Sequence, residues 1–237
     1  MDQMTLALKL PHTGGFDAFV AEGNDETVTA LRQWAVGAGQ RYLFLHGTEA
    51  SGKSHLLQAA CREAIDHGRT LLYLPLDHAG LQPAILEDLE RRDAVVVDAL
   101  QAIAGDDAWE RGLFGLYNRL QDAGKYLLVA ARVPPPALGL GLADLTSRLS
   151  AGPAYLLRPL DDDGRARLLG VAAQQRGLSL DSAAVGYILS RCPRDPGALL
   201  RLLDELDRVS LQRRRAPTVR LIGELLASDN RTNIWRG

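Results

Sequence analysis

Apolar residues in this chain fall into short continuous runs, separated by longer stretches in which they recur every three to four positions. The runs lie at 42–47, 70–76, 94–100 and 125–131, and the helix-like stretches between them lie at 53–67, 83–92 and 108–122. Continuous apolar strands that alternate with amphipathic helices indicate a parallel sheet covered on both faces. A short helix near 142–149 and a strand at 154–160 complete the pattern. We therefore expect an α/β fold in which helices flank a five-stranded parallel sheet.

The pattern changes at Asp161. Acidic residues at a predicted helix start are followed by apolar residues at helical spacing, and two or three further helices follow without a strand. This predicts a small all-helical lid domain at 161–228 after a nucleotide-binding base domain at 16–160. The breaker cluster "PHTGG" separates a flexible arm at 1–15, and 229–237 is expected to be a frayed tail.

Composition narrows the class of protein. Hydrophobic residues make up 46% of the 237 residues, which is enough for a real core, and the net charge of -2 argues against a protein that is basic overall and wraps nucleic acid. Cys61 and Cys192 are far apart and form no metal-binding or disulfide pattern. The N-terminus lacks the long apolar core of a signal peptide, and no run reaches the length of a membrane span. The expected setting is the cytoplasm, with no membrane partner.

The stretch "GTEASGKS" at 47–54 has the spacing of a phosphate-binding loop, with an apolar strand before it and an apolar helix after it. Its glycines allow a tight turn whose N–H groups converge on phosphate oxygens, while the lysine neutralises them and the last serine hydroxyl ligates Mg²⁺. Asp98, which closes an apolar strand, is the natural second ligand of Mg²⁺. The predicted nucleotide-binding residues of this loop are Gly47, Thr48, Glu49, Ala50, Ser51, Gly52, Lys53, Ser54 and His55.

This domain plan resembles the AAA+ class of P-loop NTPases. The segments "FDAFVAEGNDETVTALRQWA", "YLFLHGTEASGKSHLLQAA", "VVVDALQAIAGDDAWERGLFGLYNRLQDAGK" and "LADLTSRLS" are similar to the replication initiator DnaA over residues 16–212. The short length, without an assembly domain or a DNA-binding domain, makes the chain more similar to the Hda family, the DnaA-related regulators that switch off the initiator.

The resemblance implies roles for further residues. The segment at 16–35 would line an adenine pocket, and Phe19, Val20 and Asn24 would be its nucleotide-binding residues. The cofactor would therefore be an adenine nucleotide, ADP or ATP, with Mg²⁺. Arg148, in "LTSRLS", would be an arginine finger that acts on the nucleotide of a neighbouring subunit. An arginine supplied in trans accelerates phosphoryl transfer by about 10³–10⁵.

The N-terminal arm carries a second resemblance. Gln3, Leu6 and Leu8 have the Q-x-x-L-x-L spacing of the motif by which the Hda family and DNA polymerases dock on the replication sliding clamp. An extended arm can place an amide and two leucines in a preformed apolar groove, where each buried leucine contributes roughly 1.5–3 kcal/mol.

Three departures from active AAA+ ATPases point in one direction. Ala99 stands where a second acid would orient water, and Ala130 and Ala131 stand where a polar residue would reach the γ-phosphate. In the helical domain, Gly197 stands where a nucleotide-sensing arginine is expected, and the nearby alternatives are Arg194 and Arg201. We therefore expect weak or no intrinsic hydrolysis, with the catalysed reaction in a partner's site.

The resemblance thus implies a negative regulator of replication initiation that binds the clamp and nucleotide and promotes hydrolysis of DnaA-bound ATP. DNA would be contacted only indirectly, through the clamp, and a homo-oligomer is an open alternative to a monomer. One alternative is an AAA+ helicase loader or another nucleotide-gated adaptor, which the clamp-binding spacing in the N-terminal arm disfavours. A second alternative, a self-sufficient ATPase or small-molecule phosphotransferase, is disfavoured by Ala99.

Overall fold

A computed structural model describes residues 15–193, 195–213 and 217–229. Residue contacts divide the chain into two compact units, with the boundary in the sequence between Arg158 and Pro159. Each unit has its own hydrophobic core. No helix in the described ranges is both long and apolar enough to cross a membrane.

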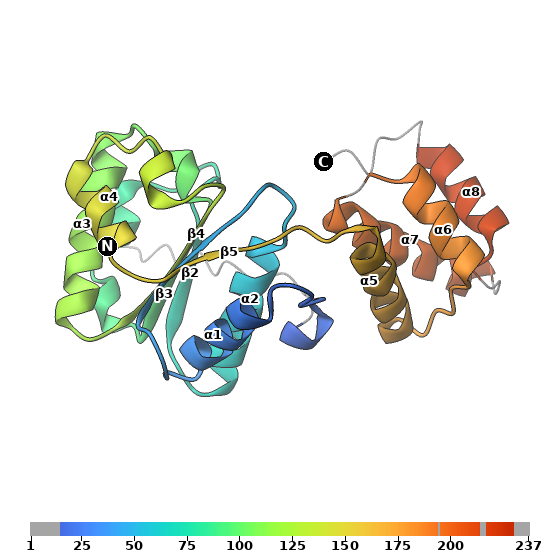
Figure 1. Cartoon of the computed structure of the whole chain (residues 1–237), viewed down its shortest axis with the longest axis horizontal. Helices are drawn as coiled ribbons and strands as arrows, with labels where there is room; N and C mark the ends of the chain where they lie inside the picture. Colours follow the sequence, from blue (N-terminus) through green and yellow to red (C-terminus); the bar gives the residue numbers. More distant parts are fainter. Residues whose placement is uncertain (1–14, 194, 214–216, 230–237) are drawn as a thin grey trace. The chain divides into compact units, whose positions relative to one another are not determined.

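Within the described residues, the first unit contains a five-stranded parallel sheet in the order β2-β3-β4-β1-β5 (Figure 1). The strands are β1 (Tyr42–His46), β2 (Leu71–Pro75), β3 (Ala94–Asp98), β4 (Tyr126–Ala131) and β5 (Ala154–Leu156). The predicted parallel five-stranded sheet is confirmed. The carboxyl ends of β1, β3 and β4 lie along one edge, since His46 pairs with Ala131 and Val97 pairs with Val129.

Helices cover both faces of this sheet, as the uninterrupted apolar strands require. On one face, α1 (Asp25–Ala35) and α2 (Lys53–Asp66) share a core with alternate strand residues such as Leu45 and Val96. On the other face, α3 (Asp107–Asp122) and α4 (Ala143–Ser150) pack against the strand residues between them, such as Phe44 and Val97. The remaining ordered turns of this unit are the 3₁₀ helices η1 (Phe16–Ala18), η2 (Pro83–Leu86), η3 (Leu89–Arg91), η4 (Leu100–Ile103) and η5 (Pro135–Ala137).

Two predicted elements differ from the structure. The helix expected at 83–92 is wrong, because η2 and η3 are separate 3₁₀ turns. Asp88 between them has a left-handed backbone with φ of 57°, which ends any right-handed helical run. The last strand is also shorter than 154–160, since β5 ends at Leu156.

Asp93, just before β3, joins the amino-terminal ends of neighbouring strands, opposite their carboxyl ends. Its carboxylate accepts hydrogen bonds from the Thr70 backbone N–H (2.9 Å) and hydroxyl (2.8 Å), and from the Lys125 ammonium (3.2 Å). These hydrogen bonds, those from Thr70 first, lower the pKa of Asp93 to about 2. The negative charge therefore links the starts of three neighbouring strand segments.

The second unit contains, in its described part, the helices α5 (Asp162–Gln175), α6 (Ser182–Arg191), α7 (Pro196–Arg213) and α8 (Val219–Asp229). Asp161 and Asp181 each accept a backbone N–H at the start of the following helix, so both are N-caps. The acidic helix start predicted at 161 is thus present. Leu169, Ile188, Leu203 and Ile222 are fully buried among the four helices. A helical lid domain after an α/β base is thus confirmed.

Candidate functional site

The predicted phosphate loop connects β1 to α2 and needs glycine at two positions. Gly52, just before α2, has φ of 94°, a conformation that residues with a side chain rarely adopt. A Cβ atom at Gly47 would lie 2.5 Å from the carbonyl oxygen of Leu157 and 3.0 Å from Ser51 Oγ, so only glycine fits there. Ala50 is also left-handed, with φ of 58°. The loop therefore holds a strained turn directly before a helix N-terminus.

The N-terminus of α2 is suited to an anion. Its N-cap residue, Gly52, has no side chain to accept the first-turn N–H groups, and the dipoles of these groups add to a positive end. Lys53 is half-buried in the same turn, and its ammonium donates to the carbonyl oxygens of Gly47 (2.8 Å) and Thr48 (2.7 Å). Burial lowers the pKa of Lys53, and the nearby charge of Asp98 opposes that shift. The geometry therefore concentrates donors and one cation at the loop.

An aromatic side chain lies against the end of this loop. The Phe19 ring is so close to Gly52 that a Cβ atom there would be 2.9 Å from Phe19 Cε2. The same ring lies 5.8 Å from the His55 ring, between centroids, and is only partly buried. Burial lowers the pKa of His55, which favours its neutral form. Phe19 thus presents a half-exposed apolar face beside the phosphate loop, and Val20 follows it in the chain.

Asn24 has a different environment. Its side chain is 3% exposed and exchanges two hydrogen bonds with the main chain of Arg158, as donor at 3.1 Å and as acceptor at 2.9 Å. These bonds attach the segment before α1 to the residues that follow β5. The structure therefore shows Asn24 as a buried link between these two segments.

Asp98 ends β3 with its side chain 5% exposed. The Tyr73 hydroxyl donates to Oδ2 (2.7 Å) and the Ala99 backbone N–H donates to Oδ1 (2.8 Å). Burial and this carboxylate raise the pKa of Tyr73, and burial raises the pKa of the Cys61 thiol to about 12. Both neighbours thus remain protonated at neutral pH.

The oxygen atoms of Asp98 and Ser54 are suitable ligands for Mg²⁺. Each oxygen of Asp98 keeps a second lone pair, and Ser54, exposed in the first turn of α2, adds a hydroxyl. Oxygen ligands of this kind fit Mg²⁺. Within the described residues no cluster of three or more metal-binding side chains exists. The residues therefore fit an ion that phosphate oxygens help to hold, as Mg²⁺ prefers.

The alanines predicted to weaken hydrolysis lie at this edge. Ala99 has φ of 57° and begins η4, and Ala130 and Ala131 are fully buried at the end of β4. The next residue, Arg132, was missed by sequence reasoning. Its guanidinium lies 3.5 Å from the Glu49 carboxylate of the phosphate loop, and its backbone N–H donates to Gln101 Oε1 (3.1 Å). Its position as the first polar residue after β4 was the available signal.

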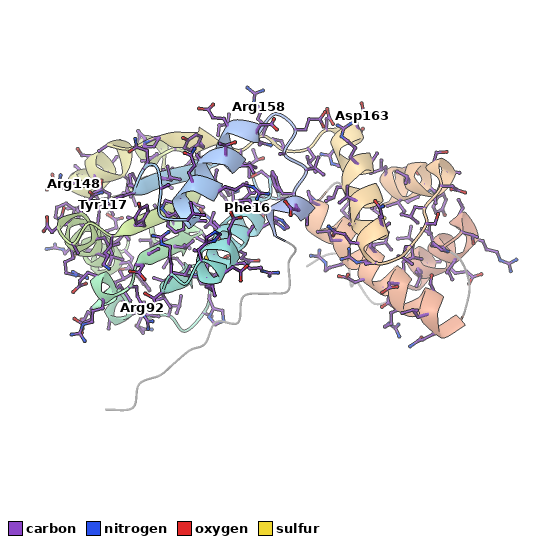
Figure 2. The ribbon with its side chains drawn as sticks, turned by 90° about the horizontal axis from the view of Figure 1, so that it is seen from below. Phe16, Arg92, Tyr117, Arg148, Arg158 and Asp163 are labelled. Carbon is purple, nitrogen blue, oxygen red and sulfur yellow. The ribbon has the colours of Figure 1, made fainter. Side chains whose placement is uncertain are left out.

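Arg148 lies on α4, at the far side of the sheet from α1 and α2. Leu145 and Leu149 of this helix are fully buried, and the buried Tyr42 hydroxyl donates to the carbonyl of Leu149 (2.7 Å). Arg148 itself is exposed near Tyr117 of α3, whose pKa is raised by burial against the opposing charge of Arg148 (Figure 2). Among the described residues no carboxylate pairs with Arg148. A cation without an ion-pair partner is thus held on a well-packed helix.

Other predicted residues lie elsewhere. On the lid, Gly197 is in the first turn of α7, and Arg201 lies 3.7 Å from the Asp195 carboxylate that also accepts N–H groups of that turn. The alternative Arg194, and the arm residues Gln3, Leu6 and Leu8, lie outside the described residues.

A parallel sheet in the order β2-β3-β4-β1-β5, a turn with phosphate-loop spacing after β1, an acid at the end of β3 and a helical unit after the sheet make up the AAA+ fold of P-loop proteins. The helical unit also matches a known protein family. Residues 162–226 match the family model described as "Hda, lid domain".

Solved structures agree on the fold. Domain III of the replication initiation protein DnaA from Thermotoga maritima has a TM-score of 0.76 and 20% identity, over 91% of this chain and 95% of that one. AMPPCP-bound DnaA from Aquifex aeolicus has a TM-score of 0.69 and 22% identity, over 85% of this chain and 66% of that one. The RuvB Holliday junction branch migration motor of Thermotoga maritima has a TM-score of 0.66 and 20% identity, over 87% and 68%. The helical unit is thus similar to the lid domain of the Hda family, and the chain has the AAA+ fold of DnaA domain III and RuvB.

Proposed function

We propose that this protein is a negative regulator of replication initiation that supplies Arg148 in trans to ATP bound by DnaA. The observation that carries the proposal is the contrast between two edges of one unit. The edge with the phosphate loop has Ala99 where a water-orienting acid is expected, while α4 presents an exposed cation without a carboxylate partner. Such a cation can stabilise the charge that develops on a transferred phosphoryl group.

The nucleotide site of this chain then has a binding role. The loop at 47–54, the partly exposed Phe19 ring and Asp98 support an adenine nucleotide with Mg²⁺, held by Lys53 and Ser54. When bound, Mg²⁺ would neutralise phosphate charge. The related DnaA structure with AMPPCP supports the nucleotide as the ligand class. Because Ala130 and Ala131 offer no polar group at the end of β4, intrinsic turnover would be weak.

The partners follow from two features. The lid match to the Hda family supports DnaA as the protein acted on. The Gln3, Leu6 and Leu8 spacing in the arm supports docking on the sliding clamp, which would bring the regulator to DNA without direct contact.

The test is single-turnover release of phosphate from ATP loaded on DnaA, with clamp and DNA present. An arginine finger accelerates hydrolysis by about 10³–10⁵. Arg148→Ala should therefore remove most of the stimulation. Folding, nucleotide binding and clamp binding should be unchanged, because the guanidinium is exposed and has no carboxylate partner among the described residues. Arg111→Ala is the matched control, since it removes an exposed arginine that forms an ion pair with Asp107 on α3.

Two outcomes separate the alternatives. If Arg148→Ala stimulates as well as the wild type, the protein is not a finger donor and the nucleotide-gated adaptor takes its place. Ala99→Asp is a contrast variant, because an acid at that position addresses only the protein's own site. It should be neutral in the trans assay.

A further inference from the structure

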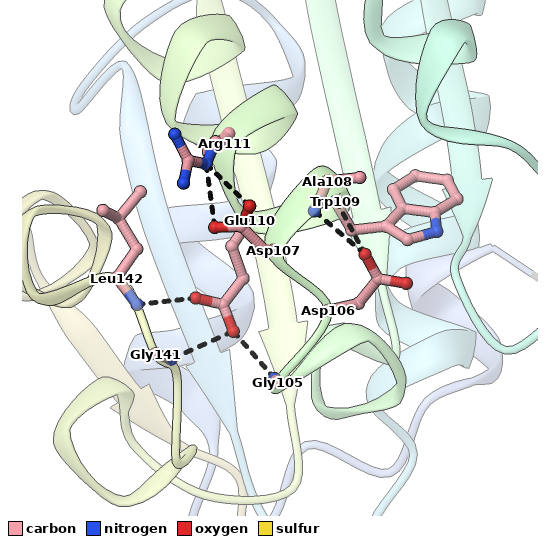
Figure 3. A network of polar contacts seen from close by, with 9 residues as sticks. All are labelled: Gly105, Asp106, Asp107, Ala108, Trp109, Glu110, Arg111, Gly141 and Leu142. Carbon is pink, nitrogen blue, oxygen red and sulfur yellow. Dashed lines mark hydrogen bonds and ion pairs between the residues drawn. The ribbon is translucent and has the colours of Figure 1, made fainter.

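A buried carboxylate lies at the N-terminal end of α4, the helix that carries Arg148. Glu110, in the first turn of α3, is 2% exposed. It accepts three backbone N–H groups: those of Gly105 (2.7 Å) and Gly141 (3.1 Å) at Oε1, and that of Leu142 (2.7 Å) at Oε2 (Figure 3). Burying a carboxylate is costly unless its oxygens are hydrogen-bonded, so such a group is retained where its bonds hold something in place.

The bonds join the segment after η4 to the start of α4. Gly141 and Leu142 directly precede α4, and Leu142 is its N-cap residue but provides no side-chain cap. Glu110 therefore caps α4 from the neighbouring helix. Its negative charge also suits the positive end of the helix dipole. Gly105 belongs to the segment that leaves the Asp98 edge through η4.

Helix α4 depends on this contact for its polar anchoring at that end. It has eight residues and follows an eleven-residue connection from β4, at 132–142, that contains three prolines and two glycines. The 3₁₀ turn η5 and the buried Leu138 order the middle of this connection, and Glu110 accepts the N–H groups of its last two residues. Apolar burial of Leu145 and Leu149 holds α4 against the core, while the Glu110 bonds hold its N-terminal end.

We propose that Glu110 is a positioning residue for Arg148. It sets the orientation of α4, and through Gly105 it ties that orientation to the segment that follows the Asp98 edge of the protein's own nucleotide site. The inference rests on the proposed function in one respect only, because the consequence for hydrolysis requires that Arg148 acts on a partner.

The variant is Glu110→Gln, in which an amide NH₂ replaces one acceptor oxygen and faces a backbone donor. Asp107→Asn is the matched control, since it makes the same chemical change in the same helical turn but at an exposed carboxylate that pairs with Arg111. Hydrogen exchange followed by mass spectrometry measures the first consequence. In Glu110→Gln the amides of 105, 141 and 142 should exchange at least about tenfold faster, with the sheet unchanged.

The trans hydrolysis assay measures the second consequence. Titration of the regulator against ATP-loaded DnaA should give a maximal rate about 10- to 100-fold lower for Glu110→Gln, because a small misplacement of a catalytic group costs this much. The half-saturating concentration should stay the same, which a general loss of structure would not produce. The double variant with Arg148→Ala should be no slower than Arg148→Ala alone.

Unchanged exchange at 141 and 142, or an unchanged maximal rate in an assay where the wild type is active, would overturn the inference. If the wild type gives no stimulation, the proposed function fails, while the exchange comparison still decides whether Glu110 holds α4. If Glu110→Gln does not fold, Glu110→Asp provides the same comparison. It keeps the charge but is one methylene shorter, so it should show intermediate exchange and rate.

Discussion

Replacing Gly52 by alanine should damage the phosphate loop in two separable ways. The backbone at φ of 94° would be occupied by a residue with a side chain, at a cost of about 1–2 kcal/mol. The new Cβ atom would lie 2.9 Å from Phe19 Cε2, and displacing that ring adds about 1–3 kcal/mol. We expect a total loss of about 2–5 kcal/mol in the free energy of unfolding of the base. Nucleotide affinity should fall at least about tenfold.

A double-mutant cycle separates the two contributions. In a Phe19→Ala background the ring is absent, so Gly52→Ala should cost only the backbone part, about 1–2 kcal/mol. Urea unfolding is followed by the fluorescence of Trp34 and Trp109, which both lie in the base unit, in a Trp235→Phe background. Nucleotide affinity is measured by calorimetry on the same samples.

The control is Gly115→Ala in α3 of the same unit. A Cβ atom there would lie 3.1 Å from Arg119 Nη1, and this guanidinium is bonded to Glu90 and to the Leu86 carbonyl. The small shift required opposes the gain of about 0.5–1 kcal/mol in helix propensity, so the net change should stay within about 1 kcal/mol. Equal costs of Gly52→Ala in both backgrounds would show that the Phe19 ring does not limit the loop. A cost below about 0.5 kcal/mol would refute the requirement for glycine.

Three further predictions concern the nucleotide, the arm and pH. Lys53→Ala should weaken nucleotide binding by about 10- to 150-fold, the range for hydrogen bonds to a charged group, and unchanged affinity by calorimetry would contradict the loop assignment. Alanine at Gln3, Leu6 and Leu8 should abolish co-elution with the clamp at nearly constant Tm, and a triple variant that still co-elutes would place the docking site elsewhere. Asp93→Asn should lower the Tm at neutral pH. Because the folded pKa is about 2, below its ordinary 3.8, that Tm difference should persist above about pH 4 and shrink as the pH falls towards 2. A constant difference across this range would exclude the charge as its cause.

What the sequence predicted correctly depends on local patterns. Strand runs such as 94–98 are apolar because both faces of the sheet are covered, and the glycine spacing at 47–54 records a turn that only glycine permits. Both signals lie within a few residues of the feature that they predict. Arg148 was found differently, from the resemblance of "LADLTSRLS" to an arginine-finger region, and the short helix expected near 142–149 is present as α4.

What the sequence did not predict depends on long-range or backbone-specific contacts. The bonds of Glu110 to Gly141 and Leu142 span 31 and 32 residues, and those of Asn24 to Arg158 span 134. No periodicity encodes such pairs. The break at Asp88 was missed because a left-handed backbone at a non-glycine residue leaves little trace in an otherwise helix-like composition.

The contact between Gly47 and Leu157 determines what holds the last residues of the first unit. Leu157 is packed against the first glycine of the loop at 47–54, and the next residue, Arg158, exchanges two hydrogen bonds with Asn24. Pro159 then begins the second unit. The end of the first unit is therefore fixed by two segments that are far apart in the sequence. A change in the backbone of either segment would alter the packing of Leu157 or the hydrogen bonds of Arg158.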